Sequence, residues 1–221
     1  MPKTDATADR KAVVKALLRR HGTTFADELG IDVAKNTPSP LFRLLCLALL
    51  LSARIRGGIA MNAARALAEE GLTTAEKMAG AGWERRTRIL NQSGYARYDE
   101  RTSRMLGDTA EMILDRYRGD LRVLREAAKR DAARERALLK EFKGIGDTGA
   151  DIFFREVQGA WTEVAPFVDR RALAAAAKLG LGDDAEALAG YMPKRDLPRL
   201  MAALVRVDMA GDHDDVLADG G

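Results

Sequence analysis

The apolar residues of this chain recur with helical spacing along nearly its whole length, and this pattern constrains the fold more than any other feature. Near the N-terminus, Val13, Val14 and Leu17 lie on one face of a predicted helix, with basic residues on the other. Segments of the same kind continue to residue 208, whereas the alternation typical of a half-buried strand never persists beyond a few positions. The sequence therefore predicts an all-α protein.

The longest apolar stretch, residues 44–53, lies within one predicted helix. It is only about half as long as a membrane span, and it closely follows Arg43. Ser39 and Pro40 form a favourable N-cap and first-turn pair, so we expect a helix from Leu41 to Ala53 that runs through the core. No association with a membrane is expected.

Glycine turns and short polar segments separate the other predicted helices. Thr73 and Glu76 have the spacing of a capping box and predict the start of a short helix. The acidic tail, residues 211–215, is expected to be frayed. The remaining helices are predicted at residues 60–70, 83–91, 98–117, 121–130, 132–142, 147–157, 169–179, 183–191 and 197–208.

The composition excludes several kinds of site. With 47% hydrophobic and 31% charged residues, the 221-residue chain is typical of a globular protein, and its 36 basic and 33 acidic residues permit DNA binding without arguing for it. A single cysteine, Cys46, and two histidines, His21 and His213, cannot form an internal disulfide, a structural zinc site or a cysteine-ligated iron–sulfur cluster. The N-terminal segment lacks the apolar core of a signal peptide, so a cytoplasmic location is expected.

The most informative segment, residues 138–152, predicts a helix, a tight turn of Gly144, Ile145 and Gly146, and a second helix. Glycines allow a positive φ and let the turn approach another backbone closely. The N–H groups of the turn and of the following helix would form a site for an anion such as a DNA phosphate. Ile145 can anchor the turn to the core. Taken alone, the segment is also compatible with a plain connection between two helices.

A second informative segment is the apolar loop 165–168, which leads to Asp169 at the start of a predicted helix. Aspartate is among the residues most favoured at the N-cap of a helix. By itself, this spacing favours a capping role for Asp169.

Together, in this order and at this separation, the two segments resemble the endonuclease III-like helix-hairpin-helix DNA glycosylase superfamily. The family pattern is a hairpin of the form L-P-G-V-G, a later V-D ahead of a helix, and an R-L-G-L ending. The matching segments here are residues 142–146, 168–169 and 178–181. Upstream, residues 39–53 resemble the family's S-P-F…L-L-S-A-Q helix, and Gly94-Tyr95 resembles its G-hydrophobic…K-A motif. The resemblance spans roughly residues 10 to 210.

The resemblance implies an all-α, two-lobed helix-hairpin-helix DNA glycosylase fold with a cleft between the lobes. Residues 36–157 would form a helical barrel lobe that ends in the helix-hairpin-helix element. Residues 1–35 and 158–221, from the two ends of the chain, would form the second lobe. The protein is expected to be a monomer.

The resemblance also implies base-excision repair: hydrolysis of the N-glycosidic bond of a damaged or mismatched base that is flipped out of double-stranded DNA. The carboxylate of Asp169 would stabilise the positive charge that develops on the sugar, and would orient or deprotonate the attacking water. Bifunctional members of the family carry a lysine where this chain has Thr148. Without that amine no Schiff base forms with the sugar, so we expect no cleavage of the strand by a lyase reaction.

The resemblance assigns DNA contacts to the hairpin residues Lys143, Gly144, Ile145 and Gly146, although Lys143 can equally be an ordinary solvated lysine. Arg54 stands where the family often has a glutamine that fills the gap left by the flipped base, but it can also be a plain surface residue. No cofactor is expected, because the family's iron–sulfur cysteines are missing; the hairpin allows a monovalent cation. In a bacterium, such a protein would be associated with the nucleoid.

Two alternatives stay open at this point. The missing lysine is equally compatible with a catalytically inactive helix-hairpin-helix DNA-binding protein. The presence of Asp169 favours an enzyme. A helical protein-interaction module, in which the glycine turn is only a connector, is more distant. The sequence does not indicate which base is removed, since the low aromatic content supplies no obvious stacking cage.

Overall fold

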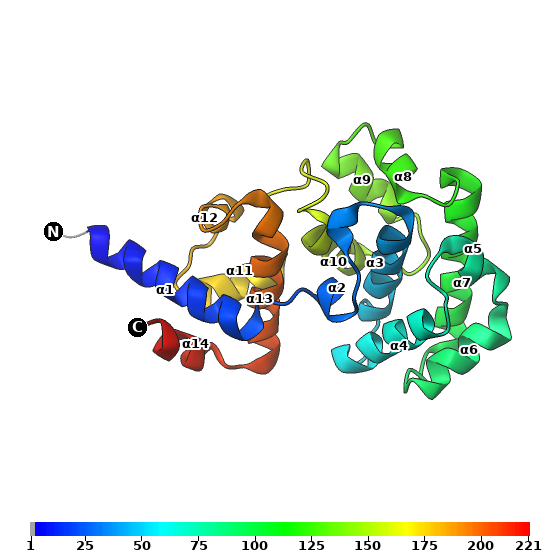
Figure 1. Ribbon diagram of the computed structural model, residues 1–221, viewed down its shortest axis with the longest axis horizontal. Coiled ribbons are helices and arrows are strands. Elements are labelled where there is room, and N and C mark those ends of the chain that lie inside the picture. Colours follow the sequence, from blue (N-terminus) through cyan, green and yellow to red (C-terminus); the bar gives the residue numbers. More distant parts are fainter. Residues whose placement is uncertain (1–2) are drawn as a thin grey trace. The chain divides into compact units, whose positions relative to one another are not determined.

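The computed structural model describes residues 3–221, and it describes side chains from residue 9 onward. Within residues 3–221 every regular element is an α-helix or a short 3₁₀-helix, and this range contains no strand (Figure 1). The prediction of an all-α protein is confirmed. None of the helices in the described range is both long enough and apolar enough to span a membrane.

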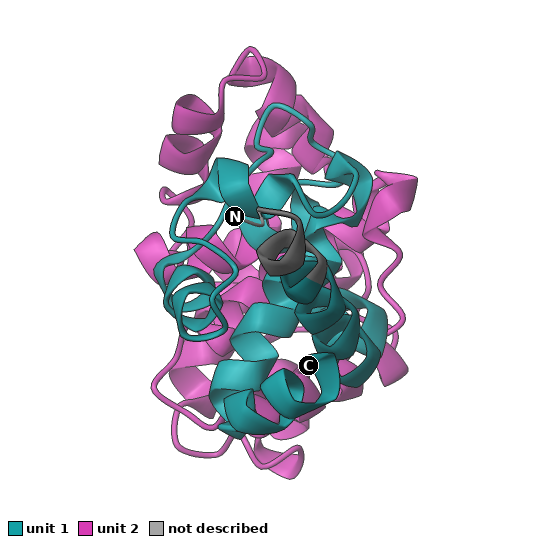
Figure 2. Cartoon of the chain, turned by 90° about the vertical axis from the view of Figure 1, so that its left-hand side faces the viewer, with its two compact units in different colours: residues 1–28, 154–221 teal, residues 29–153 magenta. Residues whose placement is uncertain are grey.

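The chain divides into two compact units, which Figure 2 shows in different colours. Unit 1 contains residues 1–28 and 154–221, and unit 2 contains residues 29–153. The lobes predicted from the sequence were residues 36–157 and residues 1–35 with 158–221.

Unit 2 is built around an apolar helix, α3 (Pro38–Leu51). Leu41, Leu47 and Leu50 are completely buried, as predicted for a core helix. Cys46 is also buried, and burial raises the pKa of its thiol to about 12. The other elements of this unit are η1 (Val33–Lys35), α4 (Gly57–Glu69), α5 (Ala75–Gly80), α6 (Trp83–Gln92), α7 (Asp99–Tyr117), α8 (Leu121–Ala127), α9 (Ala132–Leu139) and the first part of α10 (Asp147–Val157).

A buried arginine connects three helices of unit 2. Arg86 of α6 donates hydrogen bonds to the carbonyl oxygens of Met78 in α5, at 2.8 Å, and Ser103 in α7, at 3.1 Å. Its guanidinium occupies the space beside Gly107, where an added Cβ would lie 2.5 Å from Nη2. These hydrogen bonds satisfy the donors of the buried guanidinium. The bond to Met78 also satisfies a carbonyl group in the last turn of the short helix α5.

Helices α3, α4 and α5 of unit 2 start at other residues than predicted, and α4 begins at Gly57 instead of residue 60. Helix α3 begins at Pro38 instead of Leu41, with Thr37 as its N-cap residue, and Ser39 donates a hydrogen bond to the carbonyl oxygen of Thr73 at 2.9 Å. Ser39 is therefore a tertiary contact and not a cap. Helix α5 is capped by Thr74, whose hydroxyl accepts from the N–H of Lys77 at 3.4 Å, one residue later than predicted.

Unit 1 combines elements from both ends of the chain. Its central helix, α13 (Leu197–Ala210), is almost completely buried over residues 200–205 and contacts both α1 and α11. The remaining elements are α1 (Lys3–His21), α2 (Phe25–Glu28), the end of α10, α11 (Arg170–Lys178), α12 (Ala185–Ala189), η2 (Lys194–Asp196) and α14 (His213–Gly220).

The C-terminal segment is ordered, so the prediction of a frayed tail is wrong. It forms α14, which packs on α1 within unit 1. Val216 is completely buried, and a Cβ on Gly220 would lie 2.7 Å from the Cα of Val13. Asp212 and Asp219 of this C-terminal segment pair with basic residues of α1. These pairs are Arg19–Asp219 at 2.7 Å, Arg20–Asp219 at 2.8 Å and His21–Asp212 at 2.8 Å.

Candidate functional site

The predicted hairpin is formed by α9, α10 and the turn between them, which begins after Leu139 and not after Phe142. Gly144 has a φ of +92°, and a Cβ at this position would lie 2.7 Å from the sulfur of Met105. Both observations explain why glycine is needed there. Ile145 is buried, and its N–H donates to the carbonyl oxygen of Phe142 at 3.0 Å, so it holds the turn against the core of unit 2.

The outer side of the turn carries free N–H groups. Among the hydrogen bonds of the described residues, none has the N–H of Gly144 or of Gly146 as its donor. The N–H groups in the first turn of α10 have no acceptor within the helix. Gly146 is exposed, and a Cβ added to it would meet nothing within 4 Å. An anion bound at this end of α10 would therefore lie within reach of several N–H donors.

The charged residues around the hairpin are already paired. Asp147 contacts Lys140 at 2.8 Å and Arg136 at 3.3 Å, and these two cations hold the pKa of its carboxyl below the ordinary value. Lys143 is bound to Asp108 at 2.7 Å, which raises the pKa of its ammonium. All of these pairs are at least partly exposed, so water screens them and they contribute little to stability. A phosphate can therefore compete with the carboxylates for the same cations.

Thr148 lies in the first turn of α10 and is exposed. The helix packs closely on the end of α3 one residue later, because a Cβ on Gly149 would lie 2.8 Å from the hydroxyl oxygen of Ser52. The structure thus brings the hairpin close to the segment after α3, in which Arg54 is found.

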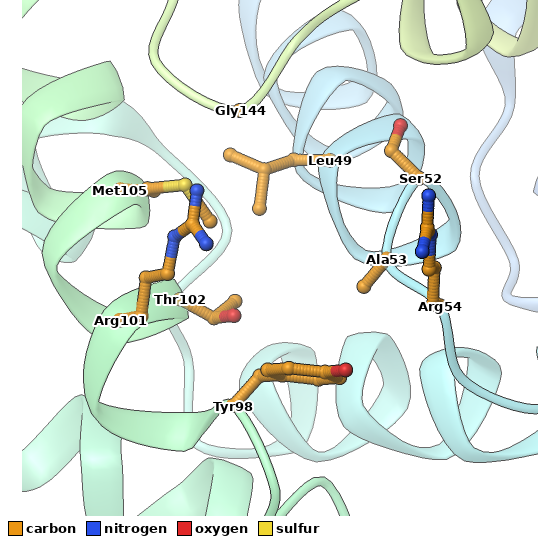
Figure 3. A pocket seen from close by; sticks show the side chains of 9 residues that line it. All are labelled: Leu49, Ser52, Ala53, Arg54, Tyr98, Arg101, Thr102, Met105 and Gly144. Carbon is orange, nitrogen blue, oxygen red and sulfur yellow. The ribbon is translucent and has the colours of Figure 1, made fainter.

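Arg54 borders a pocket of about 270 Å³ that lies entirely within unit 2 (Figure 3). Gly144 of the hairpin lines the same pocket. Sequence reasoning missed its aromatic and second basic residue, Tyr98 and Arg101, at the start of α7. Their spacing of three residues on a helix start was the available signal. The lining residues are Leu49, Ser52, Ala53, Arg54, Tyr98, Arg101, Thr102, Met105 and Gly144.

Asp169 belongs to unit 1, where it is the N-cap residue of α11. Its Oδ1 accepts from the N–H groups of Arg171 at 3.0 Å and Ala172 at 2.9 Å. Its Oδ2 accepts from Nη1 of Arg155 at 2.7 Å. A carboxylate offers about four lone-pair sites, and three of them are occupied here. One lone pair of Oδ2 remains for a further donor, such as a water molecule.

Sequence reasoning also missed Arg155, which is buried at the end of α10. Its guanidinium lies 5.1 Å from the ring centroid of Phe25, and its Nε, 3.7 Å from Oε1 of Glu156, makes no hydrogen bond. Glu156 is buried as well. Its Oε2 accepts from the N–H of Ala26 at 2.9 Å, and burial raises the pKa of its carboxyl. The adjacent charges of Arg155 and Glu156 in an otherwise apolar helix end were the signal in the sequence.

The loop that leads to Asp169 is held by Gln158. The side chain of this residue donates to the carbonyl oxygen of Phe167 and accepts from its N–H, both at 3.0 Å. Phe167 also packs edge-on against Phe154, with ring centroids 5.5 Å apart. The backbone before Asp169 is therefore fixed on two sides. Among the described residues, no group of three or more His, Cys, Asp or Glu side chains is arranged to hold a metal ion.

The described elements define an all-helical protein with a helix-hairpin-helix element. Among solved structures, two complexes of endonuclease III with DNA are similar to it: a trapped covalent intermediate with an estranged adenine, and a non-covalent complex. Each is 19% identical over 74% of this chain and 71% of that chain, with TM-scores of 0.47 and 0.48. Neither a family model nor a curated protein sequence matches the chain.

Proposed function

We propose that this protein is a DNA N-glycosylase of base-excision repair that leaves the DNA strand intact. The observation that carries the proposal is the hairpin. Its turn exposes unpartnered N–H groups of Gly144 and Gly146 at the start of α10, and Arg136, Lys140 and Lys143 surround it. A DNA phosphate is the anion best suited to a backbone site of this kind.

The chemistry would be carried by Asp169. In the hydrolysis, the oxygen of a water molecule bonds to C1′ of the sugar, the bond from C1′ to the base nitrogen breaks, and the base leaves with a proton from the water. Positive charge develops on the sugar during this step, and a fixed carboxylate stabilises it. The free lone pair of Oδ2 could orient the water, while Arg155 and the two backbone N–H groups prevent the carboxylate from rotating.

The expected product is an abasic site in an uncut strand. Thr148 stands at the position where bifunctional relatives of the motif carry the lysine, and a hydroxyl cannot form a Schiff base with the sugar. Double-stranded DNA with a damaged or mismatched base is the proposed substrate, and it would be bound by a monomer without an iron–sulfur cluster. A monovalent cation at the hairpin is compatible with this proposal.

One observation favours a second candidate, a DNA-binding protein without catalytic activity. Asp169 caps α11 and neutralises a buried arginine, and these two tasks would preserve an aspartate even if it had no role in chemistry. The hairpin would then serve DNA binding alone.

A panel of lesion-containing duplexes tests the proposal and separates the two candidates. The panel includes uracil, oxidised pyrimidines, mismatched thymine and alkylated purines. The glycosylase releases a base from at least one duplex, and the strand breaks only after alkali is added. Borohydride traps no covalent complex. Binding of all duplexes without release of any base would support the second candidate, and failure to bind DNA at low salt would contradict both.

A further inference from the structure

The pocket next to the hairpin combines three features that no part of the proposed chemistry uses. Its walls come from the segment after α3, from the start of α7 and from the hairpin turn, so elements far apart in the sequence converge on it. In Figure 3, Tyr98 lies on one side of the pocket, with the guanidinium groups of Arg54 and Arg101 to its right and left.

The pocket is basic. Two arginines and no acidic residue line it. Both arginines are exposed, and neither forms an ion pair or a hydrogen bond with another described residue. This distinguishes them from the cations nearby, since Lys143 is bound to Asp108 and Arg116 to Glu141. Unpartnered guanidinium groups are well suited to a phosphate, which they can bind through two parallel hydrogen bonds.

The pocket also offers a ring for stacking. The side chain of Tyr98 is half-buried, and in Figure 3 its ring is seen nearly edge-on, with one face turned towards the pocket. The guanidinium of Arg97 lies 5.2 Å from the ring centroid, and Arg97 does not line the pocket. The face towards the pocket is left for a flat ligand.

The volume of the pocket suits a single ring system. Its volume of about 270 Å³ is just below the range of about 300–1,000 Å³ that is typical of sites for drug-sized ligands. Leu49 and Met105 supply an apolar surface. The hydroxyl of Ser52 donates to the carbonyl oxygen of Ala48 at 2.5 Å, so towards a ligand it can act only as a hydrogen-bond acceptor.

We propose that this pocket binds one unstacked DNA nucleotide, with its base on the ring of Tyr98 and its phosphate between Arg54 and Arg101. The inference rests on the proposed function only in taking DNA as the ligand, and it requires no catalytic step. An aromatic face beside unpaired cations is the general means by which proteins hold single-stranded nucleotides.

Binding of two matched oligonucleotides to the full chain tests the inference. One is a short single strand with 2-aminopurine at a central position, and the other has an abasic residue there. We expect tighter binding of the first, with a loss of 2-aminopurine fluorescence as the base stacks. Tyr98→Leu should weaken that binding about fivefold or more and leave the abasic strand unaffected, whereas Tyr98→Phe should keep the native affinity.

The arginines are tested by the salt dependence of the same binding. Arg101→Gln should reduce the slope of log K against log salt by about 0.7, the value for one phosphate of a single strand. Arg88→Gln is the matched control, since Arg88 of α6 is exposed and does not line the pocket. It should leave the slope unchanged.

Equal affinity of the native protein for both strands would overturn the inference, and so would a Tyr98→Leu variant that binds both as the native protein does. If Tyr98→Leu does not fold, the affinities of the native protein for the two strands still test the inference. Base release is measured separately. A protein that binds as expected but releases no base contradicts the proposed glycosylase alone, and one that releases a base but fails these tests contradicts the nucleotide pocket alone.

Discussion

Arg155 and Asp169 form a buried ion pair within unit 1, with 2.7 Å between Nη1 and Oδ2 and with only 6% and 7% of their side chains exposed. The pair joins the end of α10 to the start of α11. A buried pair contributes little net stability compared with apolar residues, but removing one partner leaves an uncompensated charge. The candidate catalytic carboxylate is therefore also a structural residue, and its variants must be interpreted with that in mind.

The first prediction concerns the stability of this pair. Arg155→Met and Asp169→Asn should each lower the free energy of unfolding by about 3 kcal/mol or more. The double variant should lose clearly less than the sum, because neither of the two side chains is then left without its partner. Urea unfolding of the four proteins gives the coupling free energy. Strictly additive losses would mean that the two side chains do not stabilise each other.

The second prediction concerns catalysis. On a duplex with the correct lesion, Asp169→Asn should lose most base release at a temperature where it is still folded, because the amide cannot balance the sugar cation. DNA affinity should be retained, since Asp169 is not part of the hairpin. Single-turnover rates measured together with the dissociation constant separate the two effects. If a folded Asp169→Asn variant releases the base at the native rate, Asp169 acts only as a helix cap and has no role in catalysis.

Thr148 provides a complementary prediction. Thr148→Lys introduces an amine at an exposed position in the first turn of α10. If α10 presents this residue to the sugar, borohydride should trap a trace of covalent complex that the native protein does not form. The matched control is Thr148→Gln, which has a long polar side chain but no amine. Trapping by the native protein would show that another lysine performs the reaction.

The two hairpin glycines should respond differently to substitution. Gly144→Ala should destabilise the protein by more than about 1 kcal/mol, because φ is +92° and the Cβ meets the sulfur of Met105. Gly146→Val should leave the fold intact, since the space around Gly146 is open, but should weaken binding to DNA of any sequence by keeping the phosphate away. Thermal unfolding and DNA titration measure the two effects. If Gly146→Val binds DNA with the native affinity, the turn only connects the two helices and does not bind a phosphate.

Glu156 should give stability an unusual dependence on pH. Burial raises the pKa of this carboxyl in the folded protein above its value in the unfolded chain. Between these two values the folded state holds a proton that the unfolded state has lost, so this contribution to stability is greatest in acid and decreases as the pH rises. Glu156→Gln removes the titration. The variant should therefore gain stability relative to the native protein from acidic to neutral pH, as measured by urea unfolding at each pH, and a constant difference would contradict the prediction.

The all-helical fold and the position of the hairpin could be predicted from the sequence because both depend on local patterns. Helical spacing of apolar residues marks α3 and α7, and a glycine pair between two helices marks a turn whatever surrounds it. Asp169 could likewise be predicted to stand at the start of α11, since N-cap preference depends on neighbours in the chain.

Only the tertiary structure decided which charges are buried and what they meet. Asp212 and Asp219 belong to a segment that is acidic enough to fray by itself, yet they hold α14 on α1 because His21, Arg19 and Arg20 lie opposite them. Arg155 pairs with Asp169 across a loop, and Arg54 and Tyr98 line the same pocket although three helices separate them in the sequence. Such pairings join residues far apart in the sequence, and no local pattern carries them, because the free energy of a buried charge depends on the partner that folding brings to it.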